Sequence, residues 1–165
     1  MNEAKSDEQL GRFPNYLPGP VEVAVLTDLY VLGSEQLPSF AACWLASDVA
    51  DSEAVRELAG ENPGETWSLH RLLEQVLADL KAVVPTDAAS RRLILMQWVT
   101  SRWLGDNDTE NAIQTLARVN RTEPDFDLGD FAGLASEWTG GWGRPIPEVR
   151  ADAEETLQAQ SRITN

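Results

Sequence analysis

Apolar residues recur every three or four positions through most of the chain, a spacing that predicts amphipathic α-helices. The pattern is clearest in residues 66–84, where Pro85 marks the end of the segment. The apolar positions of this predicted helix are Trp67, Leu69, Leu72, Leu73, Val76, Leu77, Leu80 and Val84. We expect these side chains to face the protein interior and the polar residues between them to face water.

The segment from residue 21 to residue 32 fits both a strand and a helix. Its valines alternate with other residues as in a strand, whereas Pro20 before the segment and Gly33 after it are typical of the two ends of a helix. The chain contains no second β-rich run with which a strand could pair. A buried helix is therefore the prediction for these residues.

Capping residues and helix stops divide the rest of the chain into further helices. Serine, threonine and aspartate before an apolar run favour a helix start, and glycine or proline after it favours a helix end. The helices expected on this basis cover residues 38–45, 52–58, 87–104, 110–120, 128–138 and 147–161. The sequence thus predicts an all-α fold of seven or eight helices, in a single compact domain over residues 20–165. Its expected core comprises Val25, Leu29, Trp44, Leu69, Leu73, Val76, Leu80, Leu95, Val99, Ile113, Leu116, Phe131 and Leu134.

Residues 1–19 are expected to form an extended N-terminal arm. Closely spaced prolines within residues 14–20 exclude a regular helix or strand there. Phe13, Tyr16 and Leu17 are the arm residues expected to lie on the core. The first residues carry neither the basic region nor the apolar stretch of a signal peptide, and no apolar run approaches the roughly 20 residues of a membrane span. We expect a cytoplasmic protein with no membrane partner.

The charge balance narrows the classes of partner. The chain of 165 residues carries 13 basic and 27 acidic residues, for a formal net charge of -14. Proteins bind nucleic acids and anionic membranes through basic surfaces, so we expect this chain to bind neither of them directly. A basic protein is instead the kind of partner that such a charge attracts.

One stretch of the chain resembles a known helix pair. Leu104–Asp106 stands at a helix–turn, the small Ala112 allows two helices to approach, Leu116 fills the seam, and Pro124 follows twelve residues after Ala112. Residues 97–131 thereby resemble a tetratricopeptide-type helix pair, although the connecting turn is two residues longer than in that motif and no second copy follows. The stretch is also similar to the C-terminal part of a bacterial family known only as a domain of unknown function. These resemblances imply a helical scaffold and carry over no catalytic residue.

Candidate catalytic and metal-ligating residues are few. The chain has none of the local phosphate-binding, nucleophile or zinc motifs, and we expect no catalytic site and no cofactor. Cys43 lies in an apolar run and is expected to be a buried, unreactive thiol, while His70 is expected on the polar shoulder of its helix. A calcium site is one interpretation of the acidic turn at Asp106, Asp108 and Glu110. The sequence there does not have the glycine and the glutamate that an EF-hand loop requires at its sixth and twelfth positions. A solvated turn with a helix cap is the favoured interpretation.

Acidic residues dominate the first half of the chain. Residues 13–70 hold nine acidic residues against Arg56 as the one basic residue. Within this stretch the candidate partner-binding residues are Asp48, Asp51, Glu53 and Glu57. The alternatives are an electrostatic face for a basic partner and a solvated surface that keeps the protein soluble.

A glycine-rich loop supplies the other candidate surface. Trp142 and Arg144 stand among three glycines, where an aromatic ring and a guanidinium can form a binding lip. In the alternative, Trp142 packs against Val149 and Leu157, and Arg144 offsets a nearby acidic residue.

These observations favour a non-catalytic helical protein that acts in protein–protein interaction or regulation. The alternative is an acidic inhibitor, such as an immunity-type protein or a mimic of nucleic acid, that binds a basic partner. An enzyme with an unrecognised pair of carboxylates comes third. Nothing in the sequence argues against a homodimer.

Overall fold

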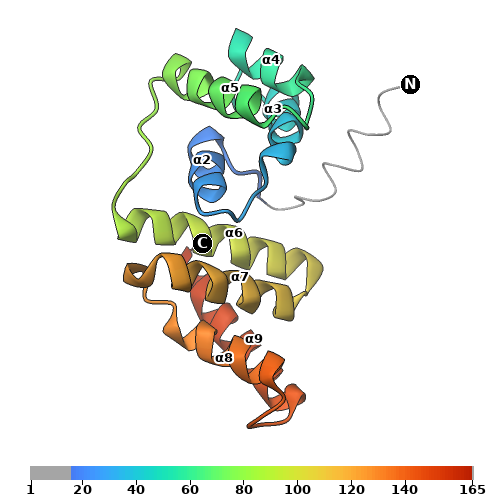
Figure 1. The fold of residues 1–165 in the computed structure, drawn as a ribbon, viewed down its shortest axis with the longest axis vertical. Helices are drawn as coiled ribbons and strands as arrows, with labels where there is room; N and C mark the ends of the chain where they lie inside the picture. Colours follow the sequence, from blue (N-terminus) through green and yellow to red (C-terminus); the bar gives the residue numbers. More distant parts are fainter. Residues whose placement is uncertain (1–15, 165) are drawn as a thin grey trace, which may run out of the picture. The chain divides into compact units, whose positions relative to one another are not determined.

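The computed structural model describes residues 16–164, which form eight α-helices, two 3-10 helices and no strand (Figure 1). The all-α fold class and the predicted number of helices are confirmed. The contacts of the chain group into two compact units, Met1–Pro85 and Thr86–Asn165. The assignment of residues 20–165 to one domain stays a prediction. Of the predicted arm, residues 16–19 are non-helical, and Phe13 lies outside the described residues.

The first unit is built from short helices around α5. Its elements are α2 (Pro20–Asp28), η1 (Ser34–Gln36), α3 (Leu37–Ala46), α4 (Glu53–Gly60) and α5 (Thr66–Asp79). Helix α4 packs against α3 and α5, and α5 also contacts α2. The buried Trp44 donates its indole N–H to the carbonyl oxygen of Pro18 over 2.8 Å, which holds the last residues of the arm against α3. Burial, followed by the charge of Glu22, raises the pKa of Tyr16 to about 12.

The segment around residues 21–32 is a helix, as predicted, but α2 ends at Asp28. Tyr30 adopts a left-handed backbone conformation with φ of 54°. The Tyr30 N–H donates to Thr27 at 3.0 Å and the Val31 N–H donates to Leu26 at 2.9 Å. These two bonds are those of a Schellman motif, which satisfies the last carbonyl groups of a helix. The motif ends α2 well before Gly33.

The second unit surrounds the pair α6 and α7. Its elements are α6 (Ala88–Asp106), α7 (Thr109–Thr122), η2 (Pro124–Phe126), α8 (Gly129–Gly140) and α9 (Ile146–Thr164). Helix α7 packs on α8 and on α6, and α9 contacts α6, α7 and α8. Asp87 and Asp108 cap the starts of α6 and α7 by accepting backbone N–H groups. The likeness of the α6–α7 pair to a tetratricopeptide repeat stays a prediction.

The core agrees with the sequence at most positions. Eleven of the predicted core residues are buried: Val25, Leu29, Trp44, Leu69, Leu73, Val76, Leu95, Val99, Ile113, Leu116 and Phe131. Leu134 is half-buried. The prediction for Leu80 is wrong, because α5 ends at Asp79 and the Leu80 side chain is 41% exposed. Among the described residues, no helix is both long and apolar enough to cross a membrane.

Candidate partner-binding surfaces

Cys43 and His70, the residue types that can act as a nucleophile and a base, lie where the sequence predicts. Cys43 is a buried free thiol, and burial raises its pKa, which disfavours the reactive thiolate. His70 lies exposed on α5. Among the described residues, neither side chain has a hydrogen bond of the kind that activates a nucleophile or orients a base.

The carboxylates around Asp108 act on the local backbone. Asp108 accepts the N–H of Asn111 at 3.0 Å, and Asp106 accepts the N–H of Asp108 at 3.0 Å. Arg102 lies 3.6 Å from the Asp106 carboxylate. The predicted helix cap is confirmed. Over residues 16–164, no group of histidine, cysteine, aspartate and glutamate side chains has the arrangement of a metal site.

The acidic candidates of the first unit fall into two groups. Glu53 and Glu57 lie exposed one turn apart on α4, whose opposite face buries Ala54, Val55 and Leu58. Asp51, by contrast, forms a two-bond ion pair with Arg56, at 2.8 and 2.9 Å.

Asp48 lies beyond the end of α3, exposed and with a positive φ of 53°. It ends that helix in the way that Tyr30 ends α2, since the next N–H, that of Val49, donates back to the carbonyl of Trp44 at 2.9 Å. The structure therefore brings Glu53 and Glu57 onto one helix face, whereas Asp51 is neutralised by Arg56 and Asp48 serves a helix end.

Trp67 is an exposed aromatic residue, although the apolar pattern of residues 66–84 predicts that it faces the protein interior. Its side chain is 78% exposed, and the guanidinium of Arg71 lies 6.0 Å from the ring centroid. Trp67 precedes the buried Leu69 by two positions, which is about 200° around an α-helix. The signal that could have revealed this is the phase of the buried residues, because Trp67 and Leu69 cannot share one face.

Trp142 lies in the loop between α8 and α9 and is 62% exposed. Its indole covers Gly140, where a Cβ would collide with Trp142 Nε1. Gly141 and Gly143 have positive φ angles of 62° and 90°, which glycine adopts without steric cost. The alternative that Trp142 is buried against Val149 and Leu157 is wrong, because most of its side chain is exposed.

Arg144, in the same loop, forms ion pairs with both flanking helices. It donates to the Glu137 carboxylate on α8 at 3.1 and 3.3 Å, and it also pairs with Asp152 on α9. The two carboxylates raise the pKa of Arg144, and its hydrogen bonds lower the pKa of Glu137. Arg144 thus offsets nearby acidic residues, as one of the two alternatives predicts, while the Trp142 side chain nearby is mostly exposed to water.

No family model, no curated protein and no solved structure matches the chain.

Proposed function

We propose that this chain is a non-catalytic helical protein that acts by binding another protein, with Trp142 as one of its contact residues. The observation that carries the proposal is the exposure of the Trp142 indole on a loop that Arg144 fastens at both sides. Tryptophan is enriched among the residues that dominate binding energy at interfaces. A loop that is already held loses less conformational entropy when a partner binds it. A cytoplasmic location belongs to the same proposal.

Affinity capture from a cell lysate tests the proposal, with the tagged chain compared with Trp142→Ala and with Leu104→Ala. Leu104 is an apolar control, because it is 49% exposed on α6. A protein retained by the parent chain and by Leu104→Ala, but lost by Trp142→Ala, supports the proposal. Equal capture by all three chains contradicts it.

The acidic inhibitor of a basic protein is a second candidate function, favoured by the arrangement on α4. Glu53 and Glu57 stand at positions i and i+4 of one exposed helix face. Like charges at this spacing destabilise a helix by a few tenths of a kcal/mol, about 0.2–0.5. A cationic partner removes that repulsion, so the arrangement suits a bound state with a basic protein.

A further inference from the structure

Trp67 exposes most of a large apolar ring at the first turn of α5, while Leu69 and Leu72 on the same helix are buried. Arg71, one turn later, lies over this ring at 6.0 Å from its centroid. A cation over one face of an indole is attracted to the ring, and most of the Trp67 side chain remains exposed beside it. Tryptophan and arginine are both among the residues enriched at interface hot spots.

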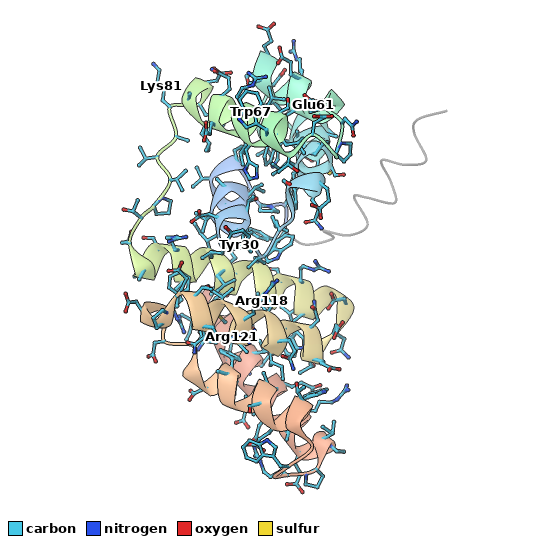
Figure 2. The ribbon with its side chains drawn as sticks, in the orientation of Figure 1. Tyr30, Glu61, Trp67, Lys81, Arg118 and Arg121 are labelled. Atoms are coloured by element: carbon cyan, nitrogen blue, oxygen red, sulfur yellow. The ribbon has the colours of Figure 1, made fainter. Side chains whose placement is uncertain are left out.

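The turn before α5 fixes the position of Trp67 relative to α4. Glu61 accepts the hydroxyl of Ser68 at 2.5 Å and the N–H of Asn62 at 2.9 Å, while Asn62 Oδ1 accepts the N–H of Gly64 at 2.9 Å. The hydrogen bond from Ser68, followed by that from Asn62, lowers the pKa of Glu61, so its carboxylate is charged at neutral pH. Figure 2 shows Glu61 and Trp67 at the junction of α4 and α5.

Three glutamates are spaced along α4, up to the turn that precedes Trp67. Glu53, Glu57 and Glu61 repeat at every fourth position, from the first residue of α4 to its C-terminal cap. Positions four apart lie on one face of an α-helix, about 6 Å from one another. Basic side chains at the same spacing on a second helix can therefore each meet a carboxylate, which is the charge complementarity that sets register between partners.

We propose that Glu53, Glu57, Glu61 and Trp67 form a docking surface, here called the α4–α5 surface, for a basic amphipathic helix of a partner protein. Arginine or lysine side chains of that helix face the glutamates, and its apolar stripe covers the indole of Trp67. This inference rests on the second candidate function and names the chemistry of the partner. Helices with one apolar face commonly bind in this manner, through anchors at helical spacing.

The test uses the full chain and a synthetic peptide as the probe. The peptide is helical, about 20 residues long, and carries leucine on one face and arginine at every fourth position of the adjacent face. A matched peptide has glutamate in place of arginine. The dissociation constant is measured by calorimetry, at several salt concentrations, for the parent chain, Trp67→Ala and the pair Glu53→Gln/Glu57→Gln. The pair Glu110→Gln/Glu155→Gln removes the same charge from exposed positions of the second unit and is the control.

We expect the arginine peptide to bind and the glutamate peptide not to bind. Trp67→Ala should raise the dissociation constant about tenfold or more, as at an interface hot spot. Glu53→Gln/Glu57→Gln should raise it and weaken its dependence on salt, whereas the control pair should change neither property. Since the replaced side chains are exposed, unfolding curves measured in parallel should lie close to that of the parent chain, and that of Glu53→Gln/Glu57→Gln should show no loss of stability.

Two results would overturn the inference, and they differ in what they leave standing. If the control pair weakens binding as much as the α4 pair, the attraction is unspecific: the α4–α5 surface is wrong, while the second candidate function survives. If the arginine peptide does not bind the parent chain at all, both are wrong. In either case the contact through Trp142 is tested separately, because Trp142→Ala should leave the peptide titration unchanged.

Discussion

Arg144 follows the end of α8 and returns to that helix, donating to both carboxylate oxygens of Glu137 at 3.1 and 3.3 Å. Two parallel bonds between a guanidinium and a carboxylate fix geometry as well as charge. Because Asp152 on α9 is the other partner of Arg144, one side chain sets the course of the loop that carries Trp142. The exposed Trp142 thus lies two residues before a side chain that a defined pair of ion pairs holds in place.

This arrangement predicts how the loop responds to acid. Arg144 lowers the pKa of Glu137 from its ordinary value of 4.5, so the ion pair contributes stability above that value and loses it as the pH falls through the lowered pKa. In the Arg144→Met variant we expect the pKa of Glu137 to return toward 4.5. A carbon-13 titration of the glutamate carboxyl groups measures both values. Equal values in the two proteins would contradict the role given to Arg144.

The left-handed conformation of Tyr30 predicts a stabilising substitution. A residue with a Cβ loses about 1–2 kcal/mol in this conformation, and glycine does not. Tyr30 is 82% exposed at the end of α2, so replacing it removes little packing (Figure 2). We expect Tyr30→Gly to raise the free energy of unfolding by about 0.5–1 kcal/mol, after the greater freedom of glycine in the unfolded chain is subtracted. Chemical denaturation measures the change.

Asp48→Gly is the control for this substitution, since Asp48 has the same backbone conformation and aspartate tolerates it better than tyrosine. Its effect should be the smaller of the two. A destabilised Tyr30→Gly protein would show that the tyrosine side chain contributes more than its exposure suggests.

The phase of α5 predicts a contrast between two leucines. Leu73 is 5% exposed, and Leu73→Ala should lower the free energy of unfolding by about 2–5 kcal/mol through lost burial and the cavity left behind. Leu80 follows the end of α5 and is 41% exposed. The loss in free energy of unfolding caused by Leu80→Ala should therefore be less than half of that caused by Leu73→Ala. Equal losses in the two variants would contradict the observed phase of the helix.

The buried hydroxyl of Thr109, in the second unit, predicts a loss of stability when its hydrogen bonds are removed. Trp103 donates its indole N–H to Thr109 Oγ1 at 3.0 Å, and Thr109 donates to Glu154 at 3.1 Å, which joins α6, α7 and α9. Thr109→Val keeps the shape and leaves the buried indole N–H without an acceptor, at a cost of about 1–3 kcal/mol. Thr109→Ser retains the hydroxyl and should lose less. If the serine variant is the less stable of the two in denaturant, the hydrogen bonds contribute less than the methyl group.

Local sequence signals predicted the helices well and their ends less well. The buried residues of α5 and α7 follow from spacing alone, because one face of each helix must leave water. The stop at Tyr30 has no such signal: the chain turns there without glycine, and the buried Leu32 beyond the turn helps to hold it. Lys81, which follows α5, is a second example, with a φ of 51°. Both ends are closed by local backbone hydrogen bonds of the Schellman type, but no glycine marks either of them in the sequence.

The candidate surfaces were predictable in part. Sequence singled out Trp142, Arg144, Glu53 and Glu57, but it left open which way the Trp142 loop turns. The residues that hold the loop at Arg144 are Glu137 and Asp152, which lie on two different helices, and no local sequence signal pairs them with Arg144. The inward position that the apolar pattern predicts for Trp67 is wrong, because Trp67 lies two positions before the buried Leu69 and so on the other side of α5.

The central claim is that Trp142 contacts a partner and does not stabilise the fold, and one pair of measurements on Trp142→Ala tests it directly. For a partner captured by the parent chain, we predict that the dissociation constant rises about 30-fold or more, the equivalent of about 2 kcal/mol, while the thermal unfolding midpoint stays unchanged. An unchanged dissociation constant would contradict the claim. So would a loss of about 3–5 kcal/mol in the free energy of unfolding, which is the cost of removing a tryptophan that packs in a core.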